Sequence, residues 1–202
     1  MKPKLTLPFR SYLLLAVLYS YHPVQAQKKL HIGVKAGAAF SNLSFKAIDP
    51  VTNTNTKPSI TFGIFLKIPL EKNFSIRPSL EYVSKGAFTS EASVYSFIYS
   101  WREKIQLTYF EIPVNLLYEL PHKRKKILMG GGPVISFLLD NYQEVRYAGN
   151  DIGVNIMTGY EWPIGASICL NYTQGLKNVA PNKSYGGKIQ NHYFGLTIGY
   201  WF

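Results

Sequence analysis

The sequence predicts an all-β fold, an eight-stranded antiparallel up-and-down β-barrel that spans a membrane. Three observations lead to this prediction. Apolar and polar residues alternate along most of the chain, which is typical of strands with two different faces. Short and long connections follow one another between these segments, as they do in transmembrane barrels. The second face of the strands carries charges and glycines, which suit a narrow barrel interior.

The N-terminus predicts export. Basic residues precede an apolar run over residues 12–21, and residues 24–26 (Val-Gln-Ala) offer a small-x-small cleavage site. This order is the pattern of a secretory signal peptide, and the apolar run is too short to cross a bilayer as a helix. We therefore predict a signal peptide over residues 1–26 and a single barrel domain over residues 27–202.

Eight segments show the alternation, an even number as expected for barrels of this kind. Ile32 and Val34 flank Gly33 in the first segment, and the same period of two recurs as far as the C-terminus. The fifth segment is the least regular because glycines blur its two faces. The segments cover residues 30–41, 60–68, 74–82, 109–119, 126–138, 151–160, 164–173 and 193–202.

The connections between these segments alternate in length. If the strands run up and down, all the short turns lie at one end and all the long loops at the other. This arrangement predicts periplasmic turns and extracellular loops. The short connections are 70–73, 121–125 and 161–163, and the long ones are 42–58, 85–103, 139–149 and 174–190.

We expect the charged face to line the lumen and the apolar face to meet lipid. The lumen of an eight-stranded barrel is just wide enough to be filled by side chains, so a conducting pore is not expected. Charges buried there need partners. The sequence therefore predicts a structural polar network formed by Lys35, Lys67, Arg77, Glu81, Glu111, Asp151 and Asn155.

Aromatic residues of the apolar face gather near the ends of the predicted strands. Two such groups match the interfacial girdles of membrane barrels. The group at the short-turn end is Phe74, Tyr118, Tyr160 and Phe202, and the other is Phe40, Tyr82, Phe110 and Tyr172.

Three prolines fall inside predicted strands, at Pro78, Pro113 and Pro133. Because proline cannot donate a hydrogen bond to the ladder, we expect bulges or bends at these positions.

The charge balance bears on partners. The chain has 22 basic and 11 acidic residues, and it remains basic when the predicted signal peptide is removed. An exported protein rarely meets nucleic acid. The excess charge therefore indicates either anionic outer-membrane lipid and lipopolysaccharide headgroups as partners or surface loops that the charge keeps solvated. The single cysteine, Cys169, excludes an intramolecular disulfide.

Catalytic and metal-binding patterns are weak. The histidines of the mature chain, at positions 31, 122 and 192, lack metal-ligand spacing, so we expect neither metal nor cofactor. His192 with Ser184 and either Glu103 or Glu144 can be drawn as a triad. No motif accompanies these residues, so no catalytic residue is predicted.

Several segments resemble the PorT-like outer-membrane β-barrel family of the Bacteroidota. They are GVKAGAAFSNLSF (33–45), TYFEIPVNLLYEL (108–120), GGGPVISFLL (130–139), DIGVNIMTGYEW (151–162), NYTQGLKNV (171–179) and FGLTIGYWF (194–202). The resemblance implies an integral barrel in the outer membrane of a Gram-negative bacterium, with both termini in the periplasm. It also implies that the barrel-insertion machinery recognises the aromatic C-terminus, with Tyr200 and Phe202 as the signal. The named member is associated with type IX secretion, a role that no segment here singles out.

The sequence thus predicts a non-enzymatic outer-membrane barrel with a structural, adhesive or secretion-accessory role. Its function is expected in the extracellular loops, where a protein partner could bind. Segment 94–101 also alternates, which indicates either a hairpin that packs on itself or an edge for strand addition. The alternatives are a lipid A-modifying barrel enzyme and a secreted soluble barrel that binds a small apolar ligand.

Overall fold

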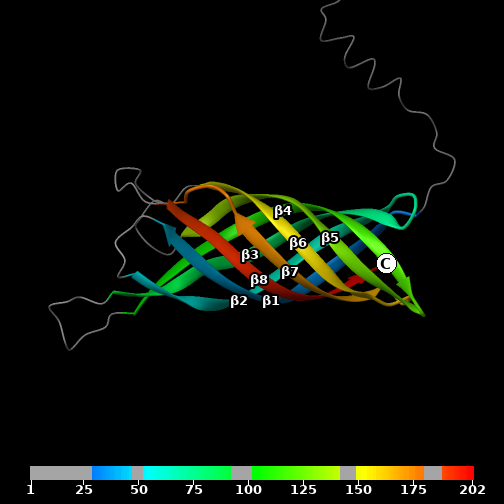
Figure 1. The fold of residues 1–202 in the computed structure, drawn as a ribbon, viewed down its shortest axis with the longest axis horizontal. Helices are drawn as coiled ribbons and strands as arrows, with labels where there is room; N and C mark the ends of the chain where they lie inside the picture. The colour runs from blue at the N-terminus through cyan, green and yellow to red at the C-terminus, as the bar shows by residue number, and fades with distance from the viewer. Residues whose placement is uncertain (1–28, 47–51, 92–101, 142–148, 180–187) are drawn as a thin grey trace, which may run out of the picture.

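A computed structural model describes residues 29–46, 52–91, 102–141, 149–179 and 188–202. Within these residues, eight strands form one closed barrel (Figure 1), which confirms the predicted fold class and strand number. The predicted signal peptide lies outside the described residues. The strands are β1 (His31–Lys46), β2 (Thr52–Pro69), β3 (Phe74–Glu91), β4 (Arg102–His122), β5 (Lys125–Asn141), β6 (Asn150–Glu161), β7 (Ala166–Gly175) and β8 (Lys188–Trp201).

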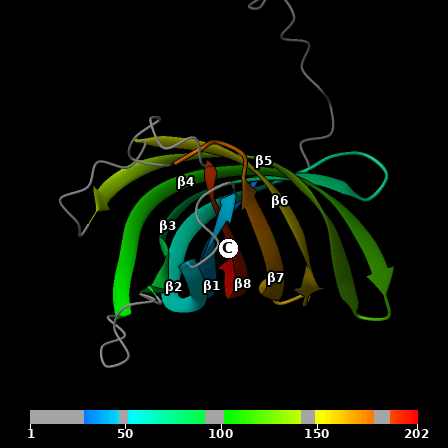
Figure 2. The same cartoon turned by 60° about the vertical axis from the view of Figure 1, so that its left-hand side comes forward.

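Each strand pairs in antiparallel fashion with its neighbours in sequence, and β8 returns to pair with β1. Figure 2 shows β1 and β8 side by side at this closure, which runs from Gly33↔Trp201 to Lys46↔Lys188. Closure pairs backbone groups within the wall itself, as a lipid environment requires. In the described part of the chain, no helix is long or apolar enough to cross a membrane.

The two ends of the barrel differ. Tight turns join β2 to β3, β4 to β5 and β6 to β7 at the end where the C-terminus lies, at the right of Figure 1. The longer connections lie at the opposite end. We call these the short-turn end and the long-loop end. The short turns thus lie at one end, as predicted, but the predicted long connection 42–58 is wrong, because only residues 47–51 separate β1 from β2.

The strands extend further toward the long-loop end than the sequence predicted. Residues 42–46 belong to β1 and residues 52–58 to β2, whereas both stretches were expected in a loop. β3 continues to Glu91 and β4 begins at Arg102, where Ser90 pairs with Arg102. Segment 94–101 lies outside the described residues.

The outer wall is apolar. Ile60 is 72% exposed and Ile198 is 68% exposed, whereas the charged residues Glu81 and Arg77 are buried inside the barrel. A barrel that works in water has the opposite arrangement, with its apolar face turned inward. The alternative of a soluble ligand-binding barrel is therefore wrong, because its predicted apolar lumen is occupied by charges.

Aromatic side chains form cross-strand rows on the outer wall. Toward the long-loop end, the rings of Phe62 and Tyr82 stack with centroids 4.9 Å apart, and Tyr82 pairs in register with Phe110. At the short-turn end, the centroids of Phe74 and Tyr118 lie 5.2 Å apart. These rows lie where the girdles were expected and mark the two boundaries of the apolar band.

Beyond the outer row, the two faces exchange character on β4, whereas Ile60 on β2 and Leu139 on β5 remain apolar and exposed. On β4, the outward side chain of Phe110 is followed by Thr108 and Gln106, while Tyr109 and Leu107 point inward and are fully buried. We call the resulting inner cluster the apolar plug. It consists of Ala39, Leu43, Val83, Ala87, Ile105, Leu107, Tyr109, Val179, Ile189 and Tyr193. The interior of the long-loop end thus has an apolar core, in contrast to the polar lumen nearer the short-turn end.

The expectation of bulges at the three prolines is wrong. Pro78, Pro113 and Pro133 pair with Val114, Val134 and Val154, and the register is the same on both sides of each. A proline removes one donor from the ladder but keeps its carbonyl, so the pairing survives the loss. The register shifts lie elsewhere, between Thr56 and Thr61 and between Thr108 and Tyr109.

Candidate functional site: the polar interior

Ion pairs fill the lumen near the short-turn end. Glu161 lies between two buried cations: Lys67 Nζ donates to its Oε1, and Arg77 Nη2 donates to its Oε2 at 2.8 Å. Glu119 accepts from Lys126 Nζ at 2.7 Å, and Lys67 Nζ lies 3.2 Å from its Oε1. Two carboxylates therefore share three cations at this level, which spreads the cost of burying each charge over several partners.

A second ion pair occupies the middle of the barrel. Lys35 Nζ donates to Glu81 Oε1 at 2.5 Å, and the Ser79 hydroxyl donates to the same oxygen at 2.6 Å. Arg77 stacks nearby on the ring of Phe65, with its guanidinium carbon 4.7 Å from the ring centroid. The cavity between these side chains leaves about 20 Å³ open to the centre of a water molecule. That space admits about one water rather than a continuous column.

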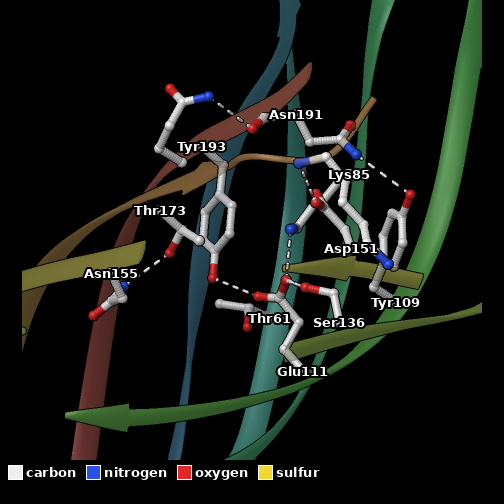
Figure 3. A network of polar contacts seen from close by, with 12 residues as sticks. Thr61, Lys85, Tyr109, Glu111, Ser136, Asp151, Asn155, Thr173, Asn191 and Tyr193 are labelled. Carbon is white, nitrogen blue, oxygen red and sulfur yellow. Dashed lines mark hydrogen bonds and ion pairs between the residues drawn. The ribbon is translucent and has the colours of Figure 1, made fainter. Parts of the chain in front are cut away.

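A third cluster centres on Glu111, nearer the long-loop end (Figure 3). Its carboxylate accepts hydrogen bonds from Lys85 Nζ at 2.5 Å, Ser136 Oγ at 2.5 Å and Tyr193 Oη at 2.9 Å. Lys85 and Glu111 are 1% and 0% exposed, which makes them the most enclosed ion pair of the described residues. The Lys85 ammonium also lies 5.0 Å from the ring centroid of Tyr109 and 5.1 Å from that of Tyr193. A buried cation is stabilised by such rings because their faces are negative.

The remaining two predicted residues are hydrogen-bonded without an ion pair. Asp151 Oδ1 accepts from the backbone N–H of Lys177 at 3.1 Å, and Asn155 Nδ2 donates to Thr173 Oγ1 at 2.8 Å. A Cβ added at Gly175 would collide with the Asp151 carboxylate, so the glycine leaves the space that this carboxylate occupies.

The structure thus brings five predicted residues into ion pairs: Lys35, Lys67, Arg77, Glu81 and Glu111. The predicted network lacks three of their partners: Lys85 and Glu161 fall in predicted connections, and Glu119 lies on a predicted strand but is not included. The signal was available, because Lys85 continues the odd-numbered inward positions of Arg77 and Glu81. Tyr109 and Tyr193 were likewise placed on the inward face but not identified as members of the network.

The apolar plug closes the lumen next to the third cluster. Tyr109 and Tyr193 belong to both, with rings in the plug and hydroxyls in the polar network. Asn191 Nδ2 donates to the Tyr109 hydroxyl at 3.3 Å (Figure 3). Close-packed apolar side chains exclude water, so the plug separates the buried charges from the long-loop end.

The histidines are far apart. His31 Nδ1 lies 3.1 Å from the backbone oxygen of Phe202 at the short-turn end, whereas His192 pairs with Asn42 toward the long-loop end. Within the described ranges, no group of three or more His, Cys, Asp or Glu side chains is placed to hold a metal ion. Ser184 and Glu144 of the drawn triad lie outside the described residues.

The C-terminal strand ends at the lipid-facing wall. Tyr200 and Phe202 are both exposed, and their ring centroids lie 5.2 Å apart. The Phe202 N–H donates to Ile32 O at 2.8 Å, which ties the last residue to β1.

The fold is shared with a known outer-membrane barrel, OprG, and weaker structural matches accompany it. The outer membrane protein OprG of Pseudomonas aeruginosa is 10% identical, with 85% of this chain and 95% of that chain covered and a TM-score of 0.54. Neisserial surface protein A is 12% identical, covering 87% of this chain and all of that one, with a TM-score of 0.48. The outer membrane protease OmpT of Escherichia coli is 11% identical, with coverage of 88% and 98% and a TM-score of 0.46. At these identities the likeness concerns the fold alone.

No curated protein matches the sequence. The profile of one family does match, and it covers residues 25–185, most of the chain. That family is described as the outer membrane protein beta-barrel domain, in agreement with the closed eight-stranded wall and its apolar outer band. The chain therefore belongs to the outer membrane protein beta-barrel domain family and resides in the outer membrane.

Proposed function

We propose that this protein is a non-enzymatic, non-conducting barrel whose polar network is structural and whose function lies in its extracellular loops. The observation that carries the proposal is the closure of the lumen. Ion pairs fill the lumen from Glu161 to Glu111, and the apolar plug adjoins the last of them. Ions need a hydrated path, and side chains this deeply enclosed are out of reach of an external substrate.

A structural, adhesive or secretion-accessory role follows from the same closure. The surfaces left for specific contacts are the two ends of the barrel, and a protein partner at the extracellular loops is part of the proposal. Membrane lipid and lipopolysaccharide surround the wall. We also propose that the chain is a PorT-like member from the Bacteroidota, on the strength of the segments quoted above, with residues 1–26 as its signal peptide.

Conductance in planar lipid bilayers tests the closure. The wild-type protein should give no channel events. A variant that empties the plug, Leu43→Ala with Leu107→Ala and Tyr193→Ala, should also give no steady current, because the ion pairs between Glu161 and Glu111 still fill the lumen next to the plug. A matched variant of the outer wall, Val114→Ala with Leu116→Ala and Ile198→Ala, should stay silent. Steady single-channel currents from the wild type would overturn the proposal.

A lipid A-modifying activity would leave a chemical trace. The mass spectrum of lipid A should be the same in a deletion strain and in its parent, because no enzymatic step is lost. A shift by the mass of an acyl chain or another lipid A substituent in the deletion strain would replace the non-enzymatic reading with the enzymatic one.

A further inference from the structure

A groove opens at the short-turn end, in the mouth of the barrel. It leaves about 400 Å³ open to the centre of a water molecule, room for a short peptide segment rather than a single ion. The β4–β5 hairpin forms one wall, and Figure 1 shows this hairpin extending past the C-terminus at the right-hand end. The groove is lined by Pro121, Lys123, Arg124, Lys125, Lys126, Glu161, Trp162, Pro163 and Trp201.

The groove carries an excess of positive charge. Its hairpin wall supplies four consecutive cations, at positions 123–126. Lys126 is paired with Glu119, but Lys123, Arg124 and Lys125 form no ion pair with any described residue. The carboxylate on the floor, Glu161, is already neutralised from below by Lys67 and Arg77. The cations of the turn are therefore available to an anionic ligand.

Aromatic and proline side chains form the rest of the lining. The Lys125 ammonium lies 5.3 Å from the ring centroid of Trp162, and the Lys67 ammonium lies 5.3 Å from that of Trp201. The Trp162 ring beside Lys125 and the Trp201 ring therefore add apolar contact area to the charge of the groove. This combination suits a polypeptide that carries carboxylates, because such a chain has both charged and apolar contact area.

The position of the groove distinguishes between anionic ligands. Lys126, Glu161 and Trp201 belong to the inward-facing positions of their strands, so the groove opens into the barrel mouth. Lipid headgroups lie around the outside of the wall. The short-turn end of such barrels faces the periplasm, and the mouth is open to its soluble proteins.

We propose that this groove docks an acidic, extended segment of a periplasmic protein. The proposal goes beyond the function argued above, which concerns the closed lumen and the opposite end. Several cations that act on one ligand raise its local concentration and its association rate, although each exposed pair alone contributes little. Binding should therefore weaken steeply as salt is added.

The chain contains a matched control for the charge. Lys123 and Lys72 both adopt left-handed backbone conformations in tight turns at the same end, with φ of 54° and 53°. Asparagine tolerates this conformation, so Lys123→Asn and Lys72→Asn remove the same charge without straining either turn. Lys72 does not line the groove.

The test uses the mature full-length protein in phosphatidylcholine nanodiscs and a fluorescein-labelled peptide of ten glutamates. Fluorescence anisotropy should show binding that weakens about tenfold or more between low and moderate salt. Lys123→Asn should weaken binding about threefold, and Lys123→Asn with Arg124→Gln and Lys125→Gln should weaken it about tenfold or more. Lys72→Asn should match the wild type. Heat-dependent gel mobility verifies that each variant is folded.

Two results would overturn the proposal. One is equal binding by the wild type and the triple variant, or an equal loss for Lys123→Asn and Lys72→Asn. The other is a wild type that ignores the peptide but retains phosphatidylglycerol in native mass spectrometry, with the lipid lost from the triple variant. That outcome would assign the turn to lipid headgroups. Neither result changes the expectation that the wild-type protein gives no channel events. The proposal of a peptide-binding groove can therefore fail while the proposal of a closed lumen stands.

Discussion

At the scale of single residues, the Lys85–Glu111 pair shows how the lumen is stabilised. Both side chains are almost fully enclosed, and Glu111 also accepts from Ser136 and Tyr193. Removing one member of a buried pair leaves an uncompensated charge, whereas removing both charges leaves a polar group that can still be hydrogen-bonded. Losing one charge of the pair should therefore destabilise the barrel more than losing both charges.

Three variants measure the cost of leaving a buried charge without its partner. Lys85→Met should destabilise the barrel by about 3–5 kcal/mol, because the Glu111 carboxylate stays buried without its cation. The double variant Lys85→Met with Glu111→Gln should be less destabilised, since the introduced amide can accept a hydrogen bond from one of the hydroxyls of Ser136 and Tyr193 and donate to the other. Lys126→Met should cost about 1 kcal/mol or less, because Lys126 is 49% exposed and its ion pair with Glu119 is screened. Guanidinium unfolding in detergent micelles gives these values, and a double variant as unstable as Lys85→Met would contradict the pairing argument.

Sequence reasoning identified the inward residues better than their partners. Lys35, Lys67, Arg77, Glu81 and Glu111 were named because they alternate with apolar neighbours. Alternation gives the face of a side chain but not its neighbour across the lumen. That neighbour depends on strand stagger and barrel closure, which is why Lys67 meets a residue of β6, Glu161, across the lumen.

At the scale of the strands, the exchange of faces sets the limit of the membrane band. On β4, Val114 and Gln106 are both outward positions, and Phe110 lies between them. A charge on the lipid face is costly near the middle of the bilayer and nearly free outside it. Substitutions at Val114 and Gln106 therefore locate the edge of the membrane band on the outer face of β4.

Val114→Lys should destabilise the barrel by about 2–4 kcal/mol, and Gln106→Lys by about 1 kcal/mol or less. Unfolding in phosphatidylcholine liposomes measures both, because the difference requires a real hydrocarbon layer. Equal costs at the two positions would mean that the aromatic row does not mark the boundary.

The exchange also explains why the strand ends were predicted as loops. The sequence reading followed segments with an apolar outer face, and residues 42–46 and 52–58 lack one. Their apolar side chains, such as Leu43, point inward instead. Allowing the apolar positions to switch face within one strand would extend β1 past Ser41, whereas residues 52–57 of β2 have no apolar side chains and therefore no alternation to detect.

At the scale of the whole molecule, the last strand both closes the barrel and carries the proposed insertion signal. Phe194 and Tyr200 are exposed on β8, and Phe202, which follows the end of β8, is exposed as well. If the C-terminal aromatic residues are read by the insertion machinery, their loss should slow assembly in cells without weakening the finished barrel. Aromatic residues elsewhere on the strand should lack this effect.

Tyr200→Ala with Phe202→Ala should lower the folded fraction in the outer membrane several-fold while leaving refolding into detergent intact. Phe194→Ala on the same strand is the control and should assemble like the wild type. Heat-dependent gel mobility of membrane fractions gives the folded share. A double variant that assembles normally would remove Tyr200 and Phe202 as the signal.

The apolar plug has a consequence for the way the barrel enters the membrane. If the long-loop end faces the outside of the cell, as proposed, it must cross the hydrocarbon layer during assembly. The apolar plug can pack only after the long-loop ends of the strands have crossed the bilayer. During that passage the polar side chains of these strand ends must pass through the hydrocarbon layer. Assembly should thus proceed in two stages, closure of the barrel wall and then packing of the plug. Gel mobility follows the first stage, and near-ultraviolet circular dichroism of Tyr109 and Tyr193 follows the second. We expect the passage of the long-loop end through the bilayer to be the slow step, so assembly should be slower in thicker bilayers.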